Sequence, residues 1–340
     1  MRKILLTTTA MVALGSVSAI AADVSVSGNV RFRYNTWNDS IVDTVADGAN
    51  NSTMTDVLQL WVKSSATTDN GLTLGTNTRI LTGGTVDRNY ISIKGDFGSM
   101  TMGKDWGVAS SSSLGENWAA TIAGGEITAP TGTSSDAYDS IMKTTASSTS
   151  GKVNKINYST PSINGIQAKV SFADAGTAGG DSTGVVLQYK TAMADGNLTL
   201  GYIGESQTAA DGASGTADQE VSEVGASFSN GMGRIWGLKM TDKTTENGGA
   251  VATDNNGTNF GVMYQMNDAT KLIYYRIATE QDAGTNINDK YDSNTIGVRY
   301  DIAGGLRLGV LHTSFDFKDA DLTTGNSTGS ASRIEVRMDF

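Results

Sequence analysis

The chain has 340 residues, with 25 lysine and arginine residues against 35 aspartate and glutamate residues, so its formal net charge is −10. An acidic chain of this kind argues against nucleic acid as a partner, because phosphate contacts need cations. The sequence has no cysteine and a single histidine, which excludes disulfides, thiolate chemistry and the ordinary zinc sites.

Residues 1–22 are expected to form a secretory signal peptide. Arg2 and Lys3 precede an apolar stretch from Ile4 to Leu14, and small residues follow at Ala19, Ala21 and Ala22. This is the order of a signal peptide, and the apolar stretch is too short for a spanning helix. Cleavage after Ala21 or Ala22 removes Arg2 and Lys3 and leaves residues 23–340 as one exported domain with a net charge of −12.

The first segment after this site, DVSVSGNVRFRYN from Asp23, alternates strictly between two kinds of residue. Val24, Val26, Val30, Phe32 and Tyr34 share one parity, and serine, asparagine and arginine fill the other. Period-two alternation predicts a strand with different surroundings on its two faces. The same pattern recurs in IQAKVSFADA, VVLQYK and TIGVRY, and no helical period of useful length appears.

Two kinds of connection alternate along the chain. The short, glycine-rich kind is centred near Asn70, Asp96, Ile163, Asp195, Gly231, Asn267 and Gly304. The long, polar kind is expected over residues 36–55, 205–219, 241–256, 278–293 and 313–329. Short turns at one rim and long loops at the other are typical of a transmembrane barrel, and counting the strands between them predicts about 16.

Aromatic residues recur at the ends of the predicted hairpins. Each closes a strand just before a short turn or the chain end, namely Tyr158, Tyr189, Phe228, Tyr264, Tyr300 and Phe340. Amphipathic rings prefer the boundary of a membrane, so these residues are predicted to form a periplasmic girdle.

The last segment, ASRIEVRMDF, is predicted to close the barrel by pairing with Asp23–Asn35. A spanning sheet must close because lipid offers no partner for the backbone groups of an open edge. One parity faces lipid, namely Ile334, Val336, Met338 and Phe340, and the other faces water, namely Arg333, Glu335, Arg337 and Asp339.

Four stretches resemble the general bacterial porin family, particularly its alphaproteobacterial branch: ADVSVSGNVRFRY, ISIKGDFGSMTMGKDWG, KINYSTPSINGIQAKVSFADA and the terminal Phe340. The resemblance implies an all-β, antiparallel transmembrane barrel of 16 strands with short periplasmic turns and long extracellular loops. It also implies a homotrimer in the outer membrane of a Gram-negative bacterium. The third loop, about Asp105 to Gly151, would fold into the lumen, and the barrel assembly machinery would recognise the terminal aromatic residue.

A barrel of this size leaves a water-filled lumen, so selectivity depends on what narrows it. The inward parity of the early strands is basic and is predicted to line the constriction with Arg31, Arg33, Lys63, Arg79, Arg88 and Lys94. The third loop would supply the opposing acids Asp105, Glu116, Glu126, Asp136 and Asp139. The alternative is that these charges are only solvated, because a pair in high dielectric is worth about 1 kcal/mol.

No cofactor is expected. Acidic segments such as Thr253 to Asn256 and Asp316 to Asp321 offer hard oxygen ligands for structural calcium, although their spacing matches no EF-hand loop. Lipopolysaccharide cross-bridged by divalent ions would also suit such a surface.

The chain is not expected to be an enzyme. His312 is predicted at the rim or facing lipid, with no orienting acid nearby in the sequence. The primary hypothesis is a channel for passive diffusion of small hydrophilic solutes and ions. A substrate-selective channel and a structural or adhesive barrel with a closed lumen remain alternatives. Ion preference stays open, because the net charge favours cations and the arginine wall favours anions.

Overall fold

The computed structural model describes residues 22–39, 51–114, 151–174, 180–208, 217–246, 251–284, 288–318, 320 and 326–340. These form sixteen antiparallel strands and one short 3-10 turn, η1 (Thr82–Gly84). The strands are β1 (Asp23–Asp39), β2 (Asn51–Thr67), β3 (Thr73–Leu81), β4 (Val86–Gly95), β5 (Gly98–Asp105), β6 (Val153–Ser159), β7 (Ile166–Ala173), β8 (Ser182–Met193), β9 (Gly196–Gln207), β10 (Ala217–Asn230), β11 (Gly233–Glu246), β12 (Val251–Gln265), β13 (Thr270–Gly284), β14 (Lys290–Ala303), β15 (Leu306–Lys318) and β16 (Ser327–Asp339).

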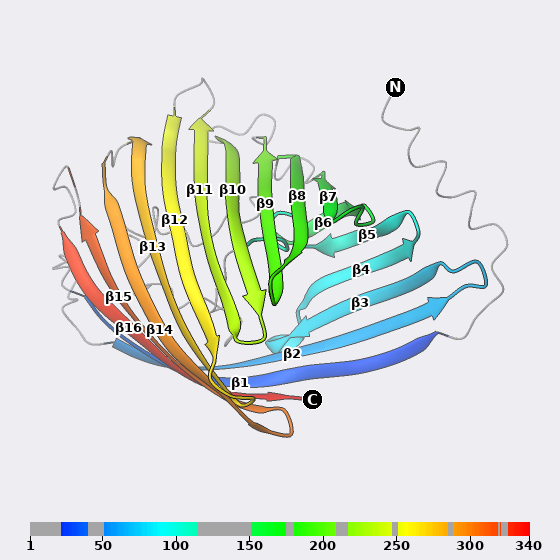
Figure 1. Ribbon diagram of the computed structural model, residues 1–340, viewed down its shortest axis with the longest axis horizontal. Helices are drawn as coiled ribbons and strands as arrows, with labels where there is room; N and C mark the ends of the chain where they lie inside the picture. Colours follow the sequence, from blue (N-terminus) through cyan, green and yellow to red (C-terminus); the bar gives the residue numbers. More distant parts are fainter. Residues whose placement is uncertain are drawn as a thin grey trace.

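Every strand pairs with its neighbours in the sequence, and β1 pairs with β16, so the sheet is a closed barrel. The C-terminus lies beside β1 (Figure 1). At this seam Phe32 is opposite Val336 and Arg33 is opposite Glu335, and the backbones of Gly28 and Phe340 exchange two hydrogen bonds of 2.8 and 3.0 Å. Both the predicted strand number and the predicted closure are confirmed.

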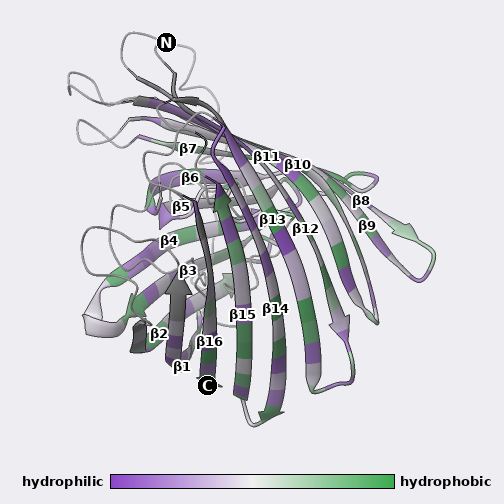
Figure 2. Cartoon of the chain, turned by 90° about the vertical axis from the view of Figure 1, so that its left-hand side faces the viewer, coloured by the Kyte–Doolittle hydropathy of each residue, from purple (hydrophilic) through white to green (hydrophobic). Residues whose placement is uncertain are grey.

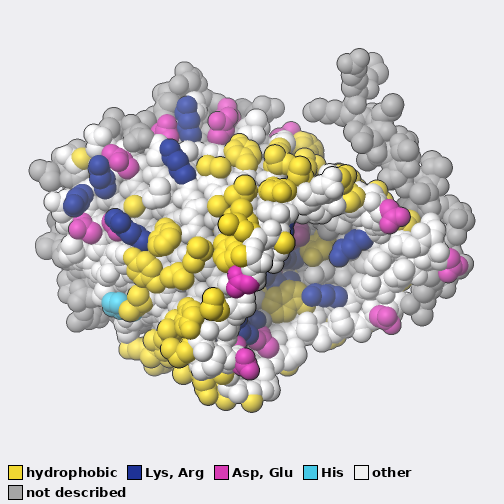
Figure 3. All heavy atoms as spheres, viewed as in Figure 1, with side chains coloured by type: hydrophobic (Ala, Val, Ile, Leu, Met, Phe, Trp, Pro, Cys, Tyr) yellow, Lys and Arg dark blue, Asp and Glu magenta, His cyan; other side chains and the backbone are white. Residues whose placement is uncertain are grey.

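The outer face of the barrel carries the apolar parity of each strand. Large exposed hydrophobic side chains occupy this face, among them Val26, Phe32, Ile235, Phe260, Ile296, Val298, Val310, Ile334, Val336 and Met338. Figure 3 shows such side chains gathered into a band over the outer surface of the wall. Figure 2 shows that hydrophobic and hydrophilic residues alternate along the strands. This arrangement is that of a sheet with lipid outside and water inside.

All seven predicted short turns join the expected strands, but the long connections are shorter than predicted. The segment 241–256, expected as a loop, is mostly strand, because β11 continues to Glu246 and β12 begins at Val251. From the sequence, the end of each strand was predicted at the point where the apolar alternation ends. Backbone pairing does not need an apolar face, so the strands continue as polar ladders towards the long loops.

The height of the wall differs around the barrel. Strands β3 to β7 have 7 to 10 residues, whereas β10 to β16 have 13 to 15. A tilted strand needs about 9–11 residues to cross a bilayer, so the longer strands extend beyond the hydrocarbon core. Within the described residues no helix is long and apolar enough to cross a membrane.

One part of the inner face departs from the rule of polar residues inside. Buried apolar side chains gather on the lumen side of β11, β13 and β15: Trp236, Leu238, Met240, Ile273, Tyr275, Ile277 and Leu311. The segment KLIYYRI has apolar residues at both parities, and the register turns Leu272 and Tyr274 outward and Ile273 and Tyr275 inward.

Candidate functional site: the lumen wall

The register places all six predicted basic wall residues on the lumen side. Arg31 and Arg33 alternate with the outward Val30 and Phe32, and the other four share their face: Lys63, Arg79, Arg88 and Lys94. They come from four adjacent strands, β1 to β4, so one side of the lumen is basic. Their position follows from period-two alternation, whereas their role in a constriction stays a prediction.

Three arginines form a row across the seam. Arg31 on β1 is directly opposite Arg337 on β16, which is directly opposite Arg307 on β15. Like charges in this position repel each other. Carboxylates offset part of the repulsion, because Arg307 lies 2.9 Å from Asp301 and the Nε of Arg337 donates to Asp339 at 2.7 Å.

Arginine–carboxylate pairs also occur two residues further along the same strands, on the same lumen wall. The Nε of Arg33 donates to Glu335 at 2.7 Å, and that of Arg299 donates to Asp301 at 2.9 Å. Sequence analysis did not select Arg299 or Arg307, although TIGVRY sets Arg299 on the polar parity. The wall from β14 through β16 to β1 therefore carries more arginines than the early strands alone predicted.

A second cluster of charges lies where β3 and β4 meet the third long connection. Arg79 and Lys152 both donate to Asp87, and Arg88 lies 3.5 Å from Asp105. Arg79 and Arg88 are directly opposite each other across the two strands. Asp105, expected in a loop, is the last residue of β5. Its carboxylate lies beside a wall arginine, whereas the role of this pair in a constriction stays a prediction.

Lys152 stands just before β6, against Trp106. Its Nζ lies 4.9 Å from the ring centroid, a distance at which a cation is attracted to the face of the ring. Burial lowers the pKa of Lys152 to about 8, and the nearby charges of Arg79, Arg88 and Lys104 add to this effect while Asp105 opposes it. The net charge of this cluster consequently changes near neutral to mildly basic pH.

The third long connection begins inside the barrel. Glu223 of β10 accepts hydrogen bonds from the hydroxyl of Ser113 at 2.9 Å and from the backbone N–H of Leu114 at 2.7 Å. Arg234 of β11 donates to the backbone carbonyl of Leu114 at 2.6 Å. Glu223 is fully buried. The described start of this connection is therefore tied to the lumen face of strands distant in sequence from it.

Further contacts hold the same segment against the wall. Lys169 donates to the hydroxyl of Ser112 at 2.9 Å, and Gln188 donates to its backbone carbonyl at 3.1 Å. The side chain of Leu114 lies over Gly201, where an added Cβ would stand 2.9 Å from its Cδ1. Glycine at position 201 thus leaves the space that this leucine fills.

The other predicted acids of this connection, Glu116, Glu126, Asp136 and Asp139, lie outside the described residues. Three lumen-facing acids were missed by sequence analysis: Glu205, Glu223 and Asp242 on β9, β10 and β11. Their strands carry apolar residues such as Ile203 and Val221 at the same parity. The alternation therefore gave no reason to select them.

The six girdle aromatics lie at the short-turn ends of their strands. Tyr189, Tyr264, Tyr300 and Phe340 are exposed on the outer face, and Tyr158 and Phe228 are half-buried there. The hydroxyl of Tyr158 donates to the backbone carbonyl of Phe97 at 2.6 Å. His312 is exposed on the outer face of β15, as expected, with its Nδ1 2.8 Å from the hydroxyl of Ser332.

The two segments considered for calcium are only partly described. Asp254 is part of β12 and Asp316 is on the outer face of β15, whereas residues 319 and 321 lie outside the described residues. Within the described ranges, no group of three or more acidic or histidine side chains could hold a metal ion. Calcium binding stays a prediction.

Comparisons with known proteins give a family and a fold. The profile of a family described as Gram-negative porin matches residues 7–320. No curated protein sequence matches the chain. A structure described as an anion-selective porin from Comamonas acidovorans has a TM-score of 0.69 and 18% identity, with 94% of this chain and 100% of that chain covered.

Two further solved structures give the same result. OmpT of Vibrio cholerae in a trimer form has a TM-score of 0.66 and 18% identity, covering 94% of this chain and 100% of its own. The outer-membrane channel DcaP of Acinetobacter baumannii has a TM-score of 0.63 and 13% identity, covering 96% and 99%. At such identities the likeness concerns the fold.

Proposed function

The chain belongs to the Gram-negative porin family and is an outer-membrane porin channel, and we propose that it passes small hydrophilic solutes passively, with a preference for anions. The observation that carries the preference is the row formed by Arg31, Arg337 and Arg307 on the lumen wall. Rings and rows of arginine are a usual device for anion pores.

The charge on the wall supports this preference over the one that the net charge suggests. The formal net charge of −10 counts every acidic residue, including those in the long polar loops. A permeating ion responds to the charges that line its path, because salt screens charges beyond a Debye length of about 8 Å. One solved relative in fold is itself named an anion-selective porin.

The same reasoning supports a channel that needs no cofactor and carries out no catalysis. On the lumen wall Arg33, Arg299 and Arg337 are paired with carboxylates, and the one histidine is on the outer face. We propose further that the chain forms a homotrimer, as the trimer form of OmpT suggests by analogy.

Single-channel recording of the purified, refolded protein in planar bilayers tests the proposal. Large ohmic steps, with a reversal potential in a salt gradient that favours chloride, are expected. A cation-favouring reversal potential would reject the anion preference while leaving a pore. Block by one class of solute would favour a substrate-selective channel, and the absence of steps from folded protein would favour a closed structural barrel.

A further inference from the structure

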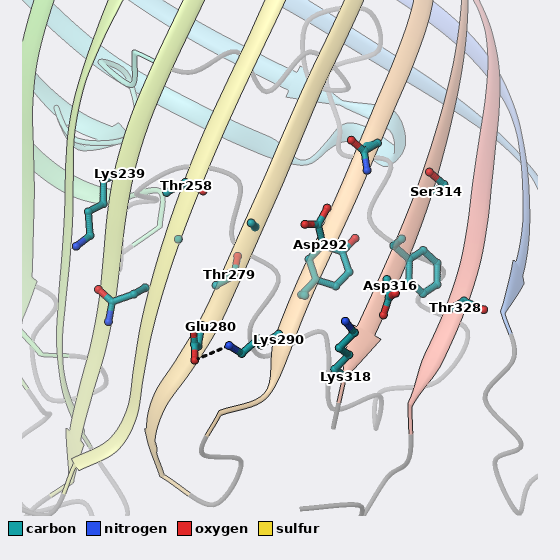
Figure 4. Close-up of a pocket in the computed structure, with 16 residues that line it drawn as sticks. Lys239, Thr258, Thr279, Glu280, Lys290, Asp292, Ser314, Asp316, Lys318 and Thr328 are labelled. Carbon is teal, nitrogen blue, oxygen red and sulfur yellow. Dashed lines mark ion pairs between the residues drawn. The ribbon is translucent and has the colours of Figure 1, made fainter. Parts of the chain in front are cut away.

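A groove of about 850 Å³ lies on the outer face of the barrel, at the long-loop ends of β11 to β16. The register shows that its charged side chains point outward, because Asp292 and Asp316 share the parity of Ile296 and Val310. Figure 4 shows these side chains grouped across β13, β14 and β15. The lumen functions discussed above do not use this surface.

Two like-charged pairs stand one above the other in the groove. Lys290 of β14 is directly opposite Lys318 of β15, and Asp292 is directly opposite Asp316 on the same face. Like charges directly opposite on a sheet destabilise it. A ligand that supplies both an anion and a cation would offset this cost.

Partners within the chain satisfy only one member of each pair. Lys290 lies 3.1 Å from Glu280, and the Nε of Arg276 donates to Asp292 at 3.0 and 3.1 Å. Lys318 and Asp316 form no hydrogen bond or ion pair with any part of the chain that the structure describes. One cation and one carboxylate therefore remain available side by side.

The position of the groove indicates which ligand would reach it. From Asp292 and Asp316 towards the short turns, the next outward level carries Arg276, Asn294 and Ser314. The levels after it carry Tyr274, Ile296 and His312, and then Leu272, Val298 and Val310. The apolar band thus begins two levels from the two aspartates, with one polar level between. A molecule with acyl chains on the band and a phosphorylated headgroup at the level of Lys290 would contact both surfaces.

We propose that this groove binds the phosphorylated headgroup of an outer-leaflet glycolipid. Lys290 and Lys318 contact a phosphate, and a divalent cation bridges the phosphate to Asp292 and Asp316. Basic residues at a membrane surface attract anionic headgroups, and hard carboxylate oxygens suit Mg²⁺ or Ca²⁺. Thr258, Asn294 and Ser314 supply neutral polar groups for sugar hydroxyls. This proposal rests on the outer-membrane location and not on the ion preference of the pore.

Native mass spectrometry of the folded protein in detergent, titrated with bisphosphorylated lipid A and Mg²⁺, tests the site. The double variant Lys290→Gln/Lys318→Gln is expected to bind lipid A about tenfold more weakly, since each basic residue near a membrane surface contributes measurably to binding anionic lipid. The control Lys104→Gln removes an outward lysine on β5, far around the barrel, and should bind normally.

EDTA treatment and a double aspartate variant test the role of the divalent cation separately from that of the lysines. EDTA should weaken binding to the unchanged protein, and Asp292→Asn/Asp316→Asn should remove that EDTA sensitivity. Equal binding of dephosphorylated lipid A, displacement by inorganic phosphate as effective as by lipid A, or a normal affinity of the lysine double variant would overturn the proposal. Unchanged single-channel conductance of each variant shows that the barrel has folded, so a failed site is distinguishable from a failed pore.

Discussion

Arg33 and Glu335, which are 302 residues apart in the chain, form a 2.7 Å ion pair across the seam between β1 and β16. The side chain of Glu335 is only 1% exposed, and that of Arg33 is 11% exposed. The pair is formed only when the barrel closes. The same ion pair therefore contributes to closure of the barrel and to the set of charges that line the lumen.

Replacing this carboxylate tests how much the pair contributes to closure. Glu335→Gln is expected to lower the free energy of unfolding by about 1–3 kcal/mol, because Arg33 keeps a weaker partner at a buried position. The temperature at which the folded band is lost on a gel measures the change. The control Glu280→Gln alters an exposed pair with Lys290 and should leave that temperature unchanged. Equal effects of both variants would contradict a special role for the seam.

The alternation between lipid and water gives the most direct test of the barrel. Val298 is exposed on the outer face between Leu272 and Val310, within the apolar band. Val298→Arg should destabilise the barrel, but by less than the about 2–4 kcal/mol of a charge at the bilayer midplane, because Val298 lies two residues from the girdle residue Tyr300. Ser27→Arg places the same charge on the lumen face and should assemble. Normal yields of folded Val298→Arg in membranes would be incompatible with a lipid-facing Val298.

The arginine row predicts a change in ion preference. Arg31→Gln/Arg337→Gln should lower the anion-to-cation permeability ratio by about two- to fivefold, because each charge in a wet lumen is worth about 1 kcal/mol or less. The reversal potential in a salt gradient measures this ratio. Lys239→Gln removes a cation from the outer face of β11 and serves as the control. An unchanged ratio in the double variant would remove this row from the permeation path.

Much of the architecture could be predicted from the sequence, because period two gives every strand residue one of two faces. That rule placed Arg31 and Val336 correctly without any knowledge of their neighbours. It failed at the loop ends, where residues such as Asp242 and Asp254 continue the ladder without an apolar face to mark it. The contacts among the charged lumen residues could be predicted only in part. Alternation shows whether a residue faces the lumen or lipid, but not its height along the barrel axis or which residue lies beside it on the next strand.

The height of a residue along the barrel axis depends on the pairing register of its strand, which the local sequence does not specify. Arg79 is opposite Arg88, and the register shifts immediately beyond Arg79. Asp87 next to this shift contacts both Arg79 and Lys152. A bulge of this kind changes which side chains meet, and it has no signature in the alternation of these two strands.

Lys152 is expected to make the ion preference of the pore depend on pH. Its pKa of about 8 lies below the usual value, so this lysine is charged at neutral pH and loses its proton between about pH 7 and pH 9. Anion preference should therefore decrease over that interval, while the neighbouring Arg79 and Arg88 remain charged. Lys152→Gln should show the lower preference at every pH, and Lys152→Arg should retain the higher one. A pH dependence that persists in Lys152→Gln would assign the titration to another group.

The anchor at Glu223 predicts that the start of the third connection controls the width of the lumen. Glu223→Gln replaces the charged acceptor that binds both Ser113 and the backbone N–H of Leu114, and charge-assisted hydrogen bonds are roughly twice as strong as neutral ones. The variant should therefore show larger or more variable single-channel conductance, because this segment leaves the wall more often.

The matched control for this anchor is Glu220→Gln, three residues earlier on β10, where the side chain is exposed. Glu220 lies on the outer face, so this control reports general effects of the substitution on β10 and not the loss of a lumen charge. The effect of that charge is separated by a variant that changes no charge. A second route to the same contact is Gly201→Val, which fills the space beneath Leu114. If both Glu223→Gln and Gly201→Val conduct like the unchanged protein, the segment from Ser112 to Leu114 does not limit the pore.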